Sequence, residues 1–162
     1  MTLIQTGKSD LHPIVLLDPP GGTFWSHFDA WMTEDLIGRG FVSPEDRCLY
    51  KVTDDINESV SEIERFYRVY HSQRFVAGRL VLRLRAMPEA SALAGLSEEF
   101  ADIITRGAIE TVEASAEEIK DEDAVDLPRI ALWFDRMRFG RLRQLIDRLN
   151  DLAVEAPAAT AR

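Results

Sequence analysis

The 162-residue sequence predicts an α/β protein: a partial Rossmann-like parallel sheet with helices, followed by a small α+β module of ferredoxin-like βαββα type. In the first part, short apolar runs alternate with longer segments of helical periodicity, which is typical of parallel strands joined by helices. Further on, apolar and polar residues alternate strictly, as expected for a sheet with one solvated face. We therefore expect one unit over residues 1–74, a second over residues 75–152 and a disordered tail over residues 153–162.

Composition restricts the class of protein and its partners. Hydrophobic residues make up 46% of the chain and charged residues 29%, which is typical of a globular domain with a substantial core. No apolar stretch approaches the roughly 20 residues that span a bilayer, and residues 1–12 lack the apolar core of a secretory signal. We therefore expect a cytoplasmic protein that does not bind membranes. The net charge of −9 argues against a nucleic-acid partner, because nucleic acids are polyanions.

The first unit opens with a helix, a strand and a second helix. Residues 1–7 have the pattern of a helix end that is capped by Gly7. Residues 14–17 form an unbroken apolar run, which predicts a strand that is buried on both faces. Apolar side chains at steps of three and four predict a helix over residues 24–37. Its expected inner face is aromatic and consists of Phe24, Phe28, Trp31, Met32 and Leu36.

A second strand and a longer helix complete this unit. After a Ser-Pro turn, residues 47–52 predict a strand that contains Cys48, the one cysteine of the chain. A lone cysteine excludes an internal disulfide, and we expect Cys48 to be a core residue rather than a nucleophile. A Thr-Asp-Asp sequence then offers N-caps for a helix over residues 55–72.

The second unit predicts the order β-α-β-β-α. Strands are expected over residues 79–85, 108–114 and 129–134, and helices over residues 93–107 and 139–149, with Gly107 ending the first of these helices. This order lacks the last strand of a ferredoxin-like unit. We therefore expect an open sheet edge, which a partner or the first unit could cover.

Charge is distributed unevenly in the second unit. An acidic segment precedes the last strand and contains Glu113, Glu117, Glu118, Asp121, Glu122, Asp123 and Asp126. Charge repulsion predicts an extended, solvated loop; a metal site is the alternative, but no recognised ligand spacing is present. The C-terminal element carries Arg129, Arg136, Arg138, Arg141, Arg143 and Arg148. We expect these arginines to pair with the acidic loop or with a partner subunit.

The segment that points most directly to function is the Pro-Pro-Gly-Gly turn after the first strand. Gly21 and Gly22 permit backbone conformations that are closed to other residues, and Thr23 is a suitable N-cap for the next helix. A loop between the carboxyl end of a parallel strand and a helix N-terminus is where open α/β sheets bind ligands. Trp25 lies beside this loop, where its indole could stack on a base. The alternative is a purely structural turn, because the Gly-Lys-Ser/Thr of a P-loop does not follow.

Several short motifs within residues 3–70 occur in a specific order and spacing. They are Gln5, Gly7, His12-Pro13, Ile14 to Leu17, Gly22 to Trp25, Gly40-Phe41-Val42-Ser43-Pro44 and Thr53-Asp54-Asp55. In these motifs the segment resembles the C-terminal half of the Rossmann-like domain of the LOG (Lonely Guy) family. The resemblance implies hydrolysis of the N-glycosidic bond of an AMP-like nucleoside 5′-monophosphate. We further expect a homo-oligomer, with no cofactor and no metal.

The resemblance also implies roles for five residues of the turn and the following helix. Gly21, Gly22 and Thr23 are expected to line the rim of the nucleotide cleft, and Phe24 and Trp25 to shape its base or ribose side. The family signature PGGxGTxxE, with its essential glutamate, is absent from this sequence. We therefore expect no catalytic residue in this chain, and we expect the chain to be the C-terminal portion of a longer protein. The competing hypothesis is a non-catalytic oligomerisation or regulatory module.

Overall fold

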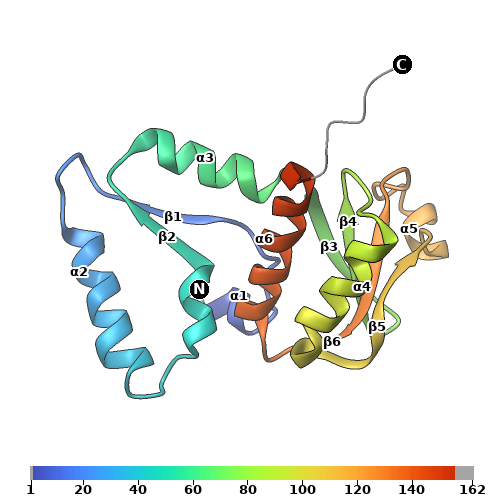
Figure 1. Ribbon diagram of the computed structural model, residues 1–162, viewed down its shortest axis with the longest axis horizontal. Helices are drawn as coiled ribbons and strands as arrows, with labels where there is room; N and C mark the ends of the chain where they lie inside the picture. The colour runs from blue at the N-terminus through green and yellow to red at the C-terminus, as the bar shows by residue number, and fades with distance from the viewer. Residues whose placement is uncertain (1, 156–162) are drawn as a thin grey trace.

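The computed structural model describes residues 2–155 and confirms the predicted mixed α/β class. Figure 1 shows two sheets separated by the long helix α6 (Phe139–Glu155). One sheet has two parallel strands, and the other has four antiparallel strands. The disordered tail expected over residues 153–162 is wrong for residues 153–155, which belong to α6, and residues 156–162 lie outside the described part of the chain.

The parallel sheet pairs β1 (Ile14–Leu17) with β2 (Tyr50–Thr53) over their whole length. The helix α1 (Thr2–Gln5) precedes it, and Gly7, at φ +66°, caps that helix as predicted. The expectation that the first strand is buried on both faces is wrong. Residues 14–16 are half-buried and Leu17 is 40% exposed, because this sheet has only two strands in residues 2–155.

The helix predicted over residues 24–37 is present as α2 (Phe24–Trp31) and a π-helical continuation, η1 (Met32–Ile37). Its predicted aromatic inner face is wrong. No residue of α2 is buried, and the exposed fractions of Phe24 and Trp31 are 70% and 49%. Instead the aromatic rings pack against one another, and Phe28 reaches the ring of Tyr50 on β2 at 6.0 Å between centroids.

The segment before β2 is a 3-10 helix, η2 (Pro44–Leu49), rather than the beginning of a strand. Its first residue is proline, which is favoured at the start of a helix because its missing N–H has no helical partner there. Cys48 therefore lies in a helix, where its half-buried thiol contacts the carbonyls of Glu45 and Gly140. Burial raises the pKa of Cys48 to about 11, so this thiol is a poor nucleophile.

The helix α3 (Ile56–Phe66) is shorter than the helix predicted for this segment. At its end the buried side chain of Asn150, from α6, donates to the carbonyl of Phe66 at 2.8 Å. The same amide accepts a hydrogen bond from the N–H of Val69 at 2.7 Å. Asn150 thus fixes the chain where the helix ends, and the strand β3 (Tyr70–Val76) begins directly afterwards.

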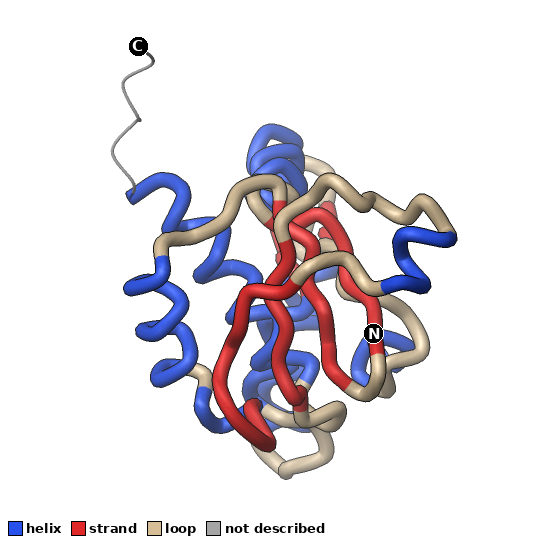
Figure 2. Tube along the Cα trace, turned by 90° about the vertical axis from the view of Figure 1, so that its right-hand side faces the viewer, coloured by secondary structure: helices blue, strands red, loops and turns tan. Residues whose placement is uncertain are grey.

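The antiparallel sheet has the strand order β3-β4-β6-β5. Figure 2 shows strands of the structure lying side by side, with helices behind them. The remaining strands of the antiparallel sheet are β4 (Arg79–Leu84), β5 (Ile104–Val112) and β6 (Arg129–Phe134), and β4 connects to β5 through α4 (Ala90–Glu99) and the 3-10 turn η3 (Ala101–Ile103). The predicted βαββα order is therefore present. However, β3 pairs along β4, so the chain itself fills the place that was expected to be an open edge.

Gly107 does not end a helix, as the sequence predicts, but lies within β5. Its φ is +71°, a left-handed conformation that glycine adopts without strain. The pairing of β5 with β6 shifts register between Arg106 and Glu110, so this glycine marks an irregularity in the strand.

One apolar core joins the two sheets. The predicted division at residues 74–75 falls inside β3. The core cluster contains residues of α1, the following loop, η2, β4 and α6, among them Ile4, Leu11, Leu49, Leu82 and Leu145. Helix α6 therefore supplies packing surface to both parts of the chain. Within residues 2–155, no helix combines the length and apolar character needed to cross a membrane.

The acidic segment is folded, so the prediction of an extended loop is wrong. It contains the short helix α5 (Ala116–Lys120), which starts with a capping box between Ser115 and Glu118. Glu118 is 1% exposed, and its carboxylate lies 2.8 Å from Arg83 and 3.3 Å from Arg129. The sheet face that was expected to be solvated is covered at this point.

The C-terminal arginines pair within the chain. Arg129 pairs with the acidic segment, as predicted. The others contact different elements: Arg138 and Arg141 pair with Asp102, Arg143 with Glu62 and Asp147, Arg148 with Glu99, and Arg136 stacks on Phe75.

Candidate ligand site at the ends of the parallel strands

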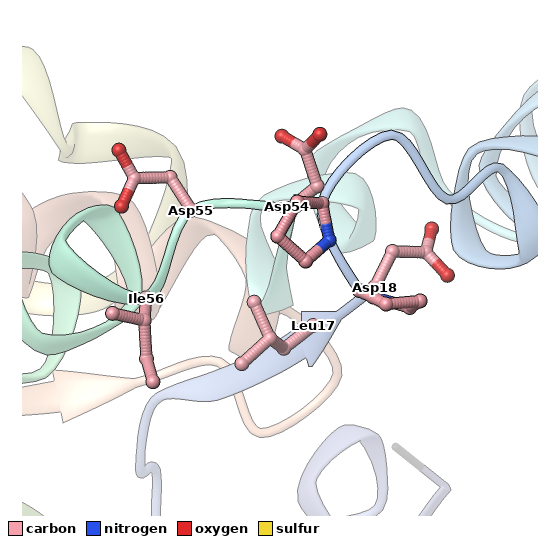
Figure 3. Close-up of a pocket in the computed structure, with 7 residues that line it drawn as sticks. Leu17, Asp18, Asp54, Asp55 and Ile56 are labelled. Atoms are coloured by element: carbon pink, nitrogen blue, oxygen red, sulfur yellow. The ribbon is translucent and has the colours of Figure 1, made fainter.

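A pocket of about 720 Å³ opens at the carboxyl ends of β1 and β2 (Figure 3). Two loops line it: Leu17, Asp18, Pro19 and Pro20 follow β1, and Asp54, Asp55 and Ile56 follow β2. The two loops meet because the strands are parallel neighbours, which brings both carboxyl ends to the same edge of the sheet. This edge is the usual ligand position in open α/β sheets.

The Pro-Pro-Gly-Gly segment forms a closed turn beside the pocket. The N–H of Gly22 donates to the carbonyl of Pro19 at 2.7 Å, and Gly21, at φ +74°, occupies the third position. Proline second and a left-handed glycine third is the arrangement typical of a type II turn. A Cβ at Gly22 would lie 2.8 Å from the Pro19 oxygen. Both glycines are therefore explained by the geometry of the turn itself.

Two carboxylates hold this turn in place. The N–H of Gly21 donates to Asp54 Oδ2 at 2.9 Å, which ties the first loop to the second. The N–H of Trp25 donates to Asp18 Oδ2 at 3.0 Å, so buried Asp18 caps α2. Thr23 occupies the N-cap position, but its side chain makes no capping hydrogen bond. Three backbone donors that a phosphate could use at this loop, those of Gly21, Gly22 and Trp25, are thus bonded to oxygens of the chain itself.

The five residues predicted to line a nucleotide cleft lie next to the pocket rather than in its lining. The N–H of Gly21 donates a hydrogen bond to Asp54, which lines the pocket, and the N–H of Gly22 closes the turn by donating to Pro19. Thr23 and Phe24 are exposed. Trp25 is half-buried, with its ring centroid 4.9 Å from that of Phe24 and 5.8 Å from that of Phe28. Their role in nucleotide binding stays a prediction.

The loop after β2 lines the pocket, which was not predicted from the sequence. Asp54 and Asp55 were expected only to cap a helix, and Asp55 does cap α3, since its carboxylate accepts a hydrogen bond from the N–H of Asn57 at 2.7 Å. One feature of the sequence does indicate that the two loops share a site. An aspartate follows each of the two predicted parallel strands, directly or within two residues. Parallel strands place such residues at one sheet edge.

The pocket is acidic and otherwise apolar. Its seven lining residues include three aspartates and no lysine, arginine or histidine. Figure 3 shows that the carboxylates point in different directions. The Asp18 carboxylate points toward α2, and the Asp55 carboxylate points away from α2. Within residues 2–155, no group of three or more metal-ligating side chains comes together. Carboxylates accept hydrogen bonds and repel phosphate, so the pocket suits hydroxyl or amino groups better than a phosphate.

A further carboxylate lies at the start of α3. Glu58 accepts hydrogen bonds from the Lys51 ammonium, at 2.7 Å, and from the Thr53 hydroxyl. These contacts lower the pKa of Glu58, which is therefore ionised at neutral pH. Lys51 is thereby paired outside the pocket and does not offset the charge of the aspartates.

Comparison with known proteins bears on this part of the chain. Residues 1–63 match the model of the family described as possible lysine decarboxylase. The matched segment includes all the residues that line the pocket. Neither the curated proteins nor the solved structures gave a match. The N-terminal 63 residues are therefore similar to the LOG family, as the sequence predicts, and the antiparallel sheet lies beyond that similarity.

Proposed function

We propose that this chain is part of a LOG-like phosphoribohydrolase, which when complete hydrolyses the N-glycosidic bond of an adenylate-type nucleoside 5′-monophosphate. The family match over residues 1–63 supports the proposal, and so does a pocket at the ligand edge of the parallel sheet. The PGGxGTxxE signature is absent from residues 1–162, so the proposal assigns this chain a binding role and no catalytic residue.

The observation that carries the proposal is the chemistry of the pocket lining. Asp18 and Asp54 retain acceptor oxygens beside an apolar wall that includes Leu17. Ribose hydroxyls and the exocyclic amine of adenine donate hydrogen bonds, so they match these carboxylates. In glycoside hydrolysis, carboxylates also stabilise the positive charge that develops on the sugar ring. We assign this pocket to the ribose and base side of the nucleotide, with Trp25 as a stacking surface beside it.

Calorimetric titration of the 162-residue chain tests this assignment. We expect saturable binding of AMP and of adenosine with similar affinity, because the pocket offers no cationic side chain to the phosphate. Ribose 5-phosphate should bind much more weakly than either. Circular dichroism establishes that the protein is folded, and absence of adenosine binding by the folded chain would refute the proposal.

A matched pair of tryptophan variants locates the site. Trp25→Ala should weaken adenosine binding, because the indole lies next to the turn. Trp31→Ala removes an equally large ring from the other end of α2, where it is 49% exposed, and should leave the affinity unchanged. Equal effects of both substitutions would show that adenosine does not bind beside the turn.

The homo-oligomer that the sequence predicts stays a proposal. Exposed apolar side chains on α2 and α3, among them Trp31 and Ile56, support it because large exposed apolar residues are common at interfaces. Sedimentation velocity over a range of protein concentrations measures the state directly. A purely monomeric profile would contradict this expectation for the 162-residue chain.

A further inference from the structure

The antiparallel sheet has a second face that is rich in arginine. In β4, Leu80, Leu82 and Leu84 belong to the core, so the alternate residues lie on the opposite side of the sheet. The pairing of β3, β5 and β6 with this register extends the same side. We call this side the outer face; it carries Arg74, Arg79, Val81, Arg83, Arg106, Arg129, Ala131 and Trp133.

The acidic segment, residues 113–128, lies on the outer face. Figure 1 shows its helix α5 on the side of the sheet opposite α6. Three carboxylates of the segment meet three arginines of the face. The contacts are Glu118 with Arg83 at 2.8 Å and Arg129 at 3.3 Å, Asp123 with Arg83 at 2.6 Å and Arg74 at 3.3 Å, and Asp121 with Arg74 at 3.2 Å.

Charge and hydrogen bonds, rather than apolar packing, attach the acidic segment to the sheet. None of residues 113–128 belongs to the apolar core cluster, and Glu118 is the one residue of the segment that is buried. Two of its larger apolar residues are exposed, Ile119 at 56% and Val125 at 37%, and Leu127 is half-buried. Arg129 supplies further polar contacts through its remaining N–H groups, which donate to the carbonyls of Asp123, Ala124, Val125 and Leu127.

The geometry around Arg83 is that of an occupied anion site. Its Nε and Nη2 both donate to Glu118 Oε1, and its two terminal nitrogens donate to the carboxylate of Asp123. A guanidinium binds carboxylate and phosphate oxygens with the same forked geometry. The carboxylates of Glu118 and Asp123 therefore mark two adjacent positions that linked phosphate groups could occupy.

We propose that the outer face is a binding site for anions with two or more linked phosphate groups, and that the acidic segment occupies it as an intramolecular competitor. A single phosphate replaces only one of the two carboxylates at Arg83, whereas a chain of phosphates replaces both. The occupied site is electrically balanced, with three arginines against three carboxylates. The segment must leave the face before the ligand binds, so its occupancy reduces the apparent affinity.

Two variants with equal charge test the competition. Variant A carries Glu118→Gln, Asp121→Asn and Asp123→Asn, which removes the three paired carboxylates. Variant B carries Glu117→Gln, Glu122→Gln and Asp126→Asn, which removes three exposed charges of the same segment. Calorimetric titration with inorganic tripolyphosphate should give about tenfold or more tighter binding to variant A than to variant B, because only variant A loses the competitor. Equal affinities would overturn the proposal.

Two further measurements separate a displaceable segment from a fixed structural element. Adding Arg74→Gln to variant A should reverse much of the gain, whereas orthophosphate should bind variant A more weakly than tripolyphosphate does. In the unmodified chain, saturating tripolyphosphate should speed hydrogen exchange in residues 115–127 relative to β4. Unchanged exchange at saturation, or loss of the cooperative unfolding transition in variant A, would show that the segment is a fixed part of the sheet and refute the proposal.

Discussion

Asp18 and Trp25 are joined across the Pro-Pro-Gly-Gly turn by a hydrogen bond of 3.0 Å, from the backbone N–H of Trp25 to Asp18 Oδ2. Asp18 is itself fixed, because its own N–H donates to the carbonyl of Thr53 at 2.9 Å. Buried Asp18 thus connects the end of β1 to the end of β2 through its backbone N–H, and to the first turn of α2 through its carboxylate.

Replacement of this carboxylate should weaken the protein through the loss of the helix cap. We expect Asp18→Ala to lower the free energy of unfolding by about 1 kcal/mol, and Asp18→Asn by less, because the amide oxygen still accepts the hydrogen bond. Thr23→Ala is the control, since the Thr23 side chain makes no capping bond. Urea unfolding measures all three, and a larger loss at Thr23 than at Asp18 would contradict this account of the cap.

The turn should tolerate no side chain at Gly22. A Cβ there would lie 2.8 Å from the Pro19 oxygen, so Gly22→Ala should lower the free energy of unfolding by about 1–3 kcal/mol. Gly95 provides the comparison, because it lies within α4 with open space around it. Gly95→Ala should stabilise the protein by roughly 0.5–1 kcal/mol through helix propensity. Thermal unfolding should give shifts of opposite sign.

Asn150 should be among the most sensitive polar residues. Its side chain is fully buried and bonds the backbone on both sides of the junction between α3 and β3. Asn150→Ala leaves buried backbone groups without partners and should lower the free energy of unfolding by at least about 2 kcal/mol. Asn57→Ala, at an exposed position, should change it by less than about 0.5 kcal/mol. A mild effect at Asn150 would show that water replaces the amide.

Lowering the pH should reduce the free energy of unfolding, because the ion pairs of Glu118 are lost when its carboxylate is protonated. Burial raises the pKa of Glu118, but hydrogen bonds from Ser115, Arg83 and Arg129 outweigh it and lower the pKa to about 2. The pKa of an unfolded glutamate is about 4.3, so this stabilisation is complete above about pH 5 and is lost as the pH falls toward 2. It is on the order of 3 kcal/mol. Glu118→Gln should flatten the pH dependence of unfolding between pH 5 and pH 2, whereas Glu117→Gln should leave the slope unchanged.

Cys48 should react slowly with alkylating agents in the folded protein. Its pKa of about 11 leaves about a hundredfold less thiolate at pH 8 than an ordinary cysteine has, and only the thiolate is reactive. Iodoacetamide labelling followed by mass spectrometry should therefore be at least tenfold slower in buffer than in 6 M urea. Equal rates would show that the thiol is accessible and ionised in the native state.

Periodicity predicted β4 and α6, whose apolar residues repeat regularly, and an unbroken apolar run predicted β1. It failed at β3, because the sequence YHSQRFV carries no apolar alternation, and Tyr67 and Tyr70 continue the helical spacing of α3. This strand forms because it pairs with β4 and because the side chain of Asn150, 80 residues further along the chain, accepts a hydrogen bond from the N–H of Tyr70. Neither contact is visible in the local sequence pattern. The folding of the acidic segment was missed for the same reason, since its arginine partners belong to other strands.

At the candidate site the sequence predicted the turn and its position at the end of a parallel strand. It did not predict which backbone donors of the turn are occupied, because Asp54 reaches Gly21 from the next strand. It also overestimated how much of α2 is covered, since helical spacing shows which residues share a face but not what lies against that face.

The packing of α1 on α6 determines when the beginning of the chain can become ordered. Gly7 lies so close to Phe139 that a Cβ there would be 2.8 Å from the ring, and Ile4 shares its core with Leu145. These partners are separated by most of the polypeptide, and ribosomes add about 5–20 residues per second. Helix α1 is therefore synthesised roughly ten seconds before α6, and only then has that surface to fold against.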